Sequence, residues 1–213
     1  KCFQRGDIPE VIRLMDKCFR GHIYSLGNLF KDKQEKILNQ IVQLKCDRVE
    51  AAYRQIYENT GLLEHFHSLR QPLPSPFFTA AEYIINADLK KIFEEGTVDC
   101  EKLTRLIGEL ERWSVPIKST GIGFAASSWI NSLMDGLKEC PEDREKFEKI
   151  DAVLWLIKPL SLSLDLWNAQ NVYFLIKEKC LNTMQEKSES GDAFAKRWLE
   201  TFRKLGSNLN VKV

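Results

Sequence analysis

Residues 164–174, Leu-Asp-Leu-Trp-Asn-Ala-Gln-Asn-Val-Tyr-Phe, place amides beside an indole in a segment whose pattern predicts a helix. At 100° per residue, Trp167, Gln170, Asn171 and Phe174 fall on one side of that helix. Amides are costly to bury unless each finds hydrogen-bond partners. The segment is therefore either a polar knot, meaning a cluster of buried polar side chains that are hydrogen-bonded within the core, or one wall of a cleft. An indole beside amides also suits a sugar, which offers an apolar ring face together with hydroxyl groups.

The two amides of this segment are expected to play different roles. Asn171 lies between Trp167 and Phe174 on the same face, which favours a place in the core. Gln170 lies at the edge of that face, which favours a cleft. If both belong to a core knot instead, replacing either amide should destabilise the fold by leaving its partners unpaired.

Two further residues complete the candidate substrate-binding set. Asp165 interrupts an apolar run just before the helix, so it is either a site residue or an N-cap or first-turn acid favoured by the helix dipole. Trp113 precedes Ser114-Val115-Pro116 at a predicted helix end, where it is a candidate to face a groove. Most of the five tryptophans are expected in the core, because each lies on or near the apolar stripe of a helix.

The sequence carries no pattern of a self-standing active site, so we predict no catalytic residue, no metal and no cofactor. One Glu-x-x-His spacing joins Glu64 to His67, but a di-iron site needs a second such pair, and no glutamate stands three residues before His22. Gly121-Ile-Gly123 lacks the preceding strand and the later glycine of a phosphate-binding loop. No Gly-x-Ser-x-Gly elbow occurs in the sequence.

Composition restricts the class of protein and its partners. The 213 residues are 44% hydrophobic and carry 31 basic against 30 acidic side chains, so nucleic acid and anionic membrane surfaces are not expected partners. No apolar stretch approaches the roughly 20 residues of a membrane span.

The six cysteines form no Cys-x-x-Cys pair, which favours reduced thiols and a cytoplasmic location. The start at Lys1 favours a fragment of a longer polypeptide, with a processed or unresolved N-terminus as the alternative.

The hydrophobic pattern is helical nearly throughout, and it predicts an all-α fold, an irregular bundle of about eight helices in a single domain spanning residues 1–213. Val211–Val213 is the only candidate for a stub of strand. The expected helices span about 7–19, 32–59, 62–69, 76–95, 99–113, a stretch with Phe124, Trp129 and Leu137, then 141–158, 164–187 and 192–205. Between them we expect a break at 21–27, a hinge at Pro72–Pro76, and punctuation at Pro116, Gly121 and Pro159.

Several strings extend beyond a generic helical pattern. They are Tyr24-Ser-Leu-Gly-Asn-Leu-Phe-Lys-Asp-Lys-Gln34, Ala80-Ala-Glu-Tyr-Ile-Ile-Asn86, Gly123-Phe-Ala-Ala126 and Leu164-Asp-Leu-Trp-Asn-Ala-Gln-Asn-Val-Tyr173. In this order they resemble the domain of unknown function 3536, a helical domain that lies C-terminal to a catalytic barrel in bacterial glycoside hydrolase family 57-like proteins. The resemblance covers nearly the whole chain.

The resemblance implies a non-catalytic accessory domain of a carbohydrate-active enzyme, a glycosidase or glucanotransferase acting on α-glucans. It also implies that the catalytic carboxylates lie on the barrel, which would be the partner of this domain. Trp167, Gln170, Asn171, Asp165 and Trp113 are offered on physical grounds rather than transferred from that family. A scaffolding bundle without sugar contact is the main alternative, and an independent helical enzyme is a weaker one. A domain made to pack on a barrel should expose a large apolar patch, with Gly21–Gly27 and Pro72–Pro76 at its rim.

Overall fold

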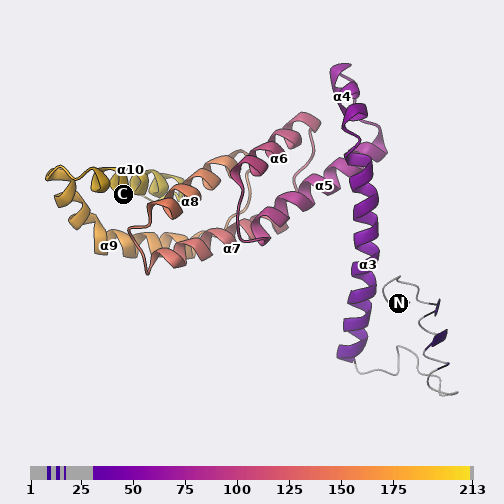
Figure 1. Ribbon diagram of the computed structural model, residues 1–213, viewed down its shortest axis with the longest axis horizontal. Coiled ribbons are helices and arrows are strands. Elements are labelled where there is room, and N and C mark those ends of the chain that lie inside the picture. Colours follow the sequence, from indigo (N-terminus) through magenta and orange to yellow (C-terminus); the bar gives the residue numbers. More distant parts are fainter. Residues whose placement is uncertain (1–8, 11–12, 15–16, 18–30, 212–213) are drawn as a thin grey trace. The chain divides into compact units, whose positions relative to one another are not determined.

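The computed structural model describes residues 9–10, 13–14, 17 and 31–211, and within these residues the chain forms eight α-helices and no strand. The all-α prediction is confirmed. The predicted break at 21–27 and most of the predicted helix over 7–19 lie outside the described residues. Figure 1 shows the helices, whose bounds are α3 Lys31–Tyr57, α4 Thr60–Ser68, α5 Ser75–Glu94, α6 Cys100–Trp113, α7 Ser119–Leu137, α8 Arg144–Ile157, α9 Trp167–Glu189 and α10 Ala193–Asn208, with a 3₁₀ turn, η2, at Lys158–Leu160.

Some of the predicted helix ends are correct, and others lie at different residues in the structure. Asp99 caps α6, its carboxylate accepting from the backbone N–H groups of Glu101 and Lys102 at 2.9 and 3.2 Å, and Asp192 caps α10 in the same way. Gly121, predicted as punctuation, lies inside α7 instead. The helix predicted from Pro141 begins later, at Arg144, because the carboxylate of Asp143 caps it. Val211 is not in a strand.

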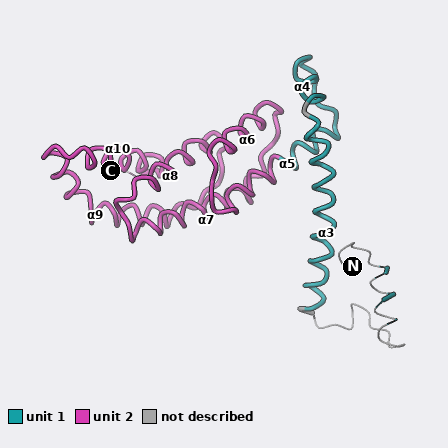
Figure 2. Tube along the Cα trace, in the orientation of Figure 1, with its two compact units in different colours: residues 1–84 teal, residues 85–213 magenta. Residues whose placement is uncertain are grey.

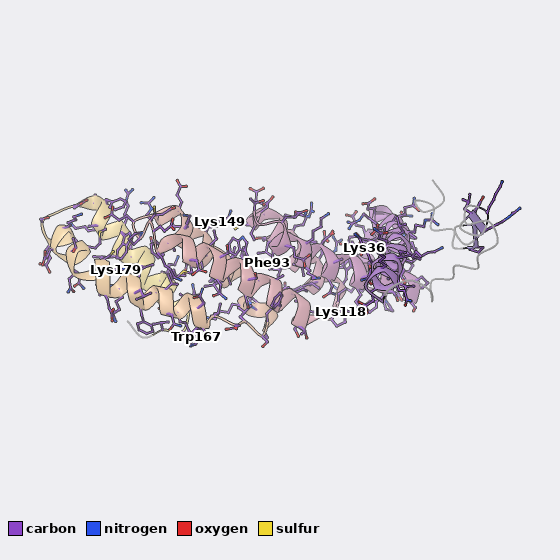
Figure 3. The ribbon with its side chains drawn as sticks, turned by 90° about the horizontal axis from the view of Figure 1, so that it is seen from below. Lys36, Phe93, Lys118, Lys149, Trp167 and Lys179 are labelled. Atoms are coloured by element: carbon purple, nitrogen blue, oxygen red, sulfur yellow. The ribbon has the colours of Figure 1, made fainter. Side chains whose placement is uncertain are left out.

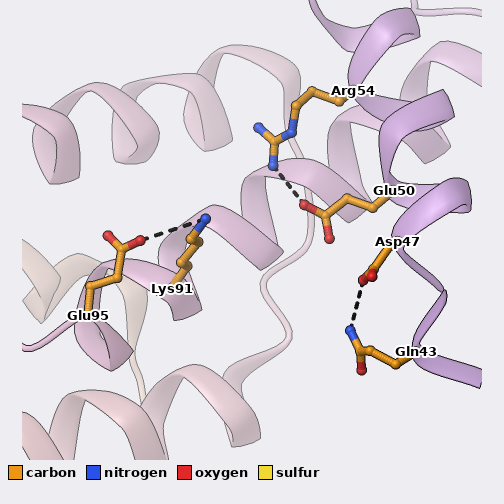
Figure 4. Close-up of polar contacts among 6 residues, drawn as sticks. All are labelled: Gln43, Asp47, Glu50, Arg54, Lys91 and Glu95. Carbon is orange, nitrogen blue, oxygen red and sulfur yellow. Dashed lines mark hydrogen bonds and ion pairs between the residues drawn. The ribbon is translucent and has the colours of Figure 1, made fainter. Parts of the chain in front are cut away.

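The chain divides into two compact units, residues 1–84 and 85–213, and the division falls within α5 (Figure 2). The single-domain assignment over residues 1–213 stays a prediction. In unit 1, i,i+4 contacts along α3 join Gln43 to Asp47 and Arg54 to Glu50 (Figure 4). Among the α3 residues whose side chains the structure describes, Ile41 alone is buried. Most of the surface of this helix is therefore exposed within unit 1.

The core of unit 2 contains an aromatic stack made by Phe147 of α8, Tyr173 of α9, and Trp198 and Phe202 of α10. The ring of Phe202 is parallel to those of Tyr173 and Trp198, at 4.1 and 4.7 Å between centroids, and Phe147 meets Trp198 and Phe202 edge to face. The polar groups of the rings are also paired, because the Tyr173 hydroxyl donates to the Phe202 carbonyl and the Trp198 indole to that of Pro141. Burial raises the pKa of the Tyr173 hydroxyl to about 12, so this hydroxyl stays neutral in the folded protein at ordinary pH.

Asn86 forms a second buried link in unit 2, between α5 and the connection that leads into α7. Its side-chain amide donates to the Pro116 carbonyl at 3.1 Å and accepts from the Lys118 N–H at 2.7 Å. Both ends of the amide are therefore used, which offsets the cost of burying it. The buried asparagine whose side-chain amide is hydrogen-bonded at both ends is therefore Asn86.

Candidate functional site

The predicted segment begins where the loop 161–166 crosses α7. Gly123 lets the two backbones approach closely, since a Cβ atom at this position would come within 2.5 Å of the Ser163 carbonyl oxygen. The Ser127 hydroxyl donates to the Gly123 carbonyl and accepts from the Asp165 N–H, both at 2.8 Å. The Asn131 amide donates to the Asp165 carbonyl at 3.1 Å and accepts from the Ala169 N–H at 3.0 Å. We call this set the α7–α9 junction, and it fixes the position of the start of α9.

Asp165 has a structural role in this junction. Its carboxylate accepts from the Trp167 N–H at 3.2 Å, next to the helix start that follows Leu166. This hydrogen bond satisfies one of the backbone donors that a helix N-terminus leaves unpaired, and a carboxylate is also favoured there by the helix dipole. Asp165 is thus neither the N-cap, which is Leu166, nor a first-turn acid, but from the position before the cap its carboxylate bonds the first backbone N–H of α9.

The side of α9 that faces solvent carries Trp167, Asn171 and Phe174, which we call the α9 outer face. Trp167 is 72% exposed and Phe174 is 46% exposed, and Figure 3 shows the indole projecting from the ribbon. Asn171 is exposed as well. The predicted spacing is thus correct, and three of the four residues on that face meet solvent.

The predicted division of roles between the two amides is wrong. Gln170 is half-buried, and its amide donates to the Leu209 carbonyl at the end of α10 at 2.9 Å, so Gln170 is the structural amide and Asn171 the exposed one. The reason is the position of the buried face of α9, which lies opposite Trp167. The buried residues of α9 are Ala169, Val172, Tyr173, Ile176 and Met184.

Trp113 belongs to another part of unit 2. It ends α6, is half-buried, and lies under the Arg112 guanidinium at 4.8 Å from the ring centroid, a cation–π contact. α6 packs on α8, whereas α9 packs on α7 and α10. The structure confirms that Trp113 ends a helix, and its candidacy to face a groove stays a prediction.

A further candidate is Trp155 on α8, which the sequence analysis did not single out. The expectation that most tryptophans are core is wrong, because Trp155 and Trp167 are 66% and 72% exposed, Trp113 is half-buried, and Trp129 and Trp198 are buried. Trp155 stands at a hollow of about 680 Å³ between α8 and α10. We call it the Trp155 hollow, and its lining is Glu148, Asp151, Ala152, Trp155, Leu156, Glu200, Thr201 and Lys204.

A signal for this hollow was present in the sequence. The residues one and two turns before Trp155 on the same face of α8 are Ala152, Asp151 and Glu148, which are small or charged. A tryptophan packed in a core would be expected to have large apolar neighbours at these spacings. Small neighbours alone carry no signal, because the buried Trp129 follows Ala125 and Ala126. The acids Asp151 and Glu148 are what distinguish Trp155 from Trp198, which has Phe194 and Phe202 one turn to either side on α10.

The described residues contain no group of three His, Cys, Asp or Glu side chains arranged to hold a metal ion. Within the same residues no helix is long and apolar enough to cross a membrane. Cys46, Cys100, Cys140 and Cys180 are free thiols, and burial raises the pKa of Cys180.

Comparisons with known proteins find no family model, no curated protein and no solved structure that matches this chain.

Proposed function

We propose that this chain is a non-catalytic helical accessory domain of a bacterial glycoside hydrolase family 57-like enzyme that acts on α-glucans. The α9 outer face would contact the catalytic barrel of the same polypeptide or line its glucan cleft. The observation that carries the proposal is the exposure of Trp167 beside Asn171 and Phe174. A flat indole with an adjacent amide and phenyl ring can stack on a sugar ring, and the amide can bond its hydroxyl groups.

The arrangement of the α7–α9 junction supports this role. Ser127 and Asn131 hold the backbone at Asp165 and Ala169, on either side of Trp167, so the start of α9 is fixed by hydrogen bonds to a neighbouring helix. A fixed platform loses less conformational entropy when it binds a ligand or a partner than a mobile one does. The proposal includes a cytoplasmic location, no cofactor, and no nucleic-acid or membrane partner.

A scaffolding role without sugar contact is the second candidate. Leu175 adjoins Phe174 in sequence and is 45% exposed, so the apolar part of this surface extends beyond what a single sugar ring needs. A protein partner would cover such a surface, as interface cores are rich in aromatic residues. Both roles predict that Trp167 is important, but only the first predicts an effect on glucan turnover.

The test uses the full polypeptide that carries this chain behind a catalytic barrel. We expect Trp167→Ala to lower the turnover of amylose about tenfold, the effect of losing roughly 1.4 kcal/mol of contact energy. Lys179→Ala, at an exposed position further along α9, is the matched control and should leave turnover unchanged. The chain alone should release no reducing sugar, since hydrolysis needs a pair of carboxyl groups held across the bond.

Two outcomes would contradict the proposal. One is an upstream coding sequence that encodes no barrel. The other is a Trp167→Ala enzyme with normal turnover of amylose and an unchanged melting temperature.

A further inference from the structure

The Trp155 hollow has the dimensions of a ligand site. Its volume of about 680 Å³ falls in the range of roughly 300–1,000 Å³ that is usual for small-molecule sites. Two helices of unit 2 line it, α8 through Asp151, Ala152 and Trp155, and α10 through Glu200 and Thr201. It is separate from the α9 outer face, which lies on another helix.

The Trp155 indole lines the hollow and is largely exposed to solvent. The indole is 66% exposed, although Leu154 beside it on α8 is buried. Ala152, one turn before Trp155, has only a methyl side chain, so the hollow is not filled next to the ring. An exposed indole beside an open space can stack on a flat ligand with an apolar face.

The polar groups of the hollow are held in place by contacts within the fold. Asp151 is 7% exposed, and its carboxylate accepts from the Asn208 amide at 2.6 Å and lies 3.7 Å from the Lys204 ammonium. The Thr201 hydroxyl donates to the Arg197 carbonyl at 2.9 Å and keeps its acceptor capacity. These groups can bond a ligand without first being ordered, which lowers the entropic cost of binding.

The charges at the hollow favour a neutral ligand over a cation. Its lining includes three carboxylates, but Glu148 is paired with Arg144 at 2.9 Å and Asp151 with Lys204 at 3.7 Å. Glu200 is the remaining acid, so the three carboxylates together with their cationic partners Arg144 and Lys204 carry a net charge of −1. A site for an ammonium or guanidinium group would be expected to keep its carboxylates unpaired and close to the indole.

We propose that the Trp155 hollow is a binding site for a neutral saccharide. The C–H face of one sugar ring would stack on the Trp155 indole, and its hydroxyl groups would donate to the Glu200 and Asp151 carboxylates, hydrogen bonds strengthened by the negative charge. The site does not involve Trp167. The choice of an α-glucan as the first probe rests on the proposed function, but the chemistry of the site does not.

The test follows the indole N–H signals of the five tryptophans of the full chain by nuclear magnetic resonance during titration with maltohexaose. We expect the Trp155 signal to shift and saturate, with a Kd on the order of 1 mM. The signals of Trp129 and Trp198 should stay in place, because both indoles are buried and donate to backbone carbonyls. Cellohexaose as a second probe tests whether the linkage matters.

Three variants, at two positions, check that the hollow itself binds the sugar. Trp155→Phe should weaken the binding measured by calorimetry several-fold, and Trp155→Ala about tenfold or more. Ala152→Leu leaves the indole in place but fills the space next to it, so it should weaken binding as well. Both changed positions are exposed on α8, so the helix should tolerate them, as circular dichroism can verify.

Three results would overturn the inference. The first is a Trp155 signal that does not move with either oligosaccharide. The second is a shift of the Trp167 signal alone, which would support the proposed function while removing this site. The third is a Trp155 signal that responds to tetramethylammonium chloride, but not to sodium chloride or sugar, which would identify a cation site. A fourth combination separates the two proposals. If the Trp155 signal shifts with sugar as expected while the Trp167→Ala enzyme keeps normal turnover, this site is supported and the proposed function is rejected.

Discussion

The α7–α9 junction and the aromatic stack hold the same helix, α9, by different kinds of interaction. On one side, Ser127 and Asn131 direct hydrogen bonds at particular backbone groups of the loop and the first turn. On the other side, Tyr173 stacks on Phe202 with an interplanar angle of 6°. Hydrogen bonds depend on direction and contribute little net stability, whereas aromatic burial contributes much more and is less directional. The stack therefore supplies stability, and the junction determines where the exposed indole of Trp167 lies.

The largest effect should come from the stack. Phe202→Ala removes the ring between Tyr173 and Trp198 and should destabilise unit 2 by about 3–5 kcal/mol. Phe194→Ala on the same helix is the control, because Phe194 is 42% exposed, and it should cost less than about 1 kcal/mol. Tryptophan fluorescence during urea unfolding is the measurement, since all five tryptophans lie between residues 113 and 198, within unit 2. Equal losses for the two variants would mean that the stack is not the main source of stability.

Alanine substitutions at Gly123 and Gly108 compare two effects of a glycine on stability, the close approach of two backbones and the low helix propensity of glycine. Gly123→Ala places a Cβ atom within 2.5 Å of the Ser163 carbonyl oxygen, so the loop must shift, and we expect a loss of about 1–3 kcal/mol. Gly108→Ala in α6 meets no atom within 4 Å and should raise stability by up to about 1 kcal/mol through helix propensity.

The sign of the change is the informative result in the same urea experiment. Opposite signs for Gly123→Ala and Gly108→Ala would establish the junction as a site of close approach. A stabilising Gly123→Ala would show that the loop at Ser163 is easily displaced.

Local features of the sequence predicted much of the fold. Asp99 and Asp192 stand directly before apolar periodic segments, and both are helix caps in the structure. The apolar face predicted for α8 is buried in full, from Phe147 to Ile157. These features depend on residues a few positions apart, which is the range over which helix periodicity and capping operate.

The candidate site was less predictable, because its contacts join residues far apart in the sequence. The amide of Asn131 bonds the backbone at residues 165 and 169, and Gln170 bonds the carbonyl of Leu209. Helix periodicity placed Trp167 and Asn171 on one face but could not show whether that face is buried, since α9 carries aromatic residues on both sides. Tyr173 and Phe174 are adjacent, yet the first is buried and the second is exposed.

The smallest effect should separate the two amides of α9. Gln170→Ala removes the donor to the Leu209 carbonyl, which ties α9 to the end of α10, and should cost about 1 kcal/mol. Asn171→Ala should change stability by less than about 0.5 kcal/mol, because an exposed asparagine side chain is lost and alanine favours the helix. Thermal melts of the two variants, followed by fluorescence, provide the comparison. If Asn171→Ala melts as low as Gln170→Ala, the outer face of α9 contributes to the fold, and its residues no longer qualify as a surface kept for a partner or a sugar.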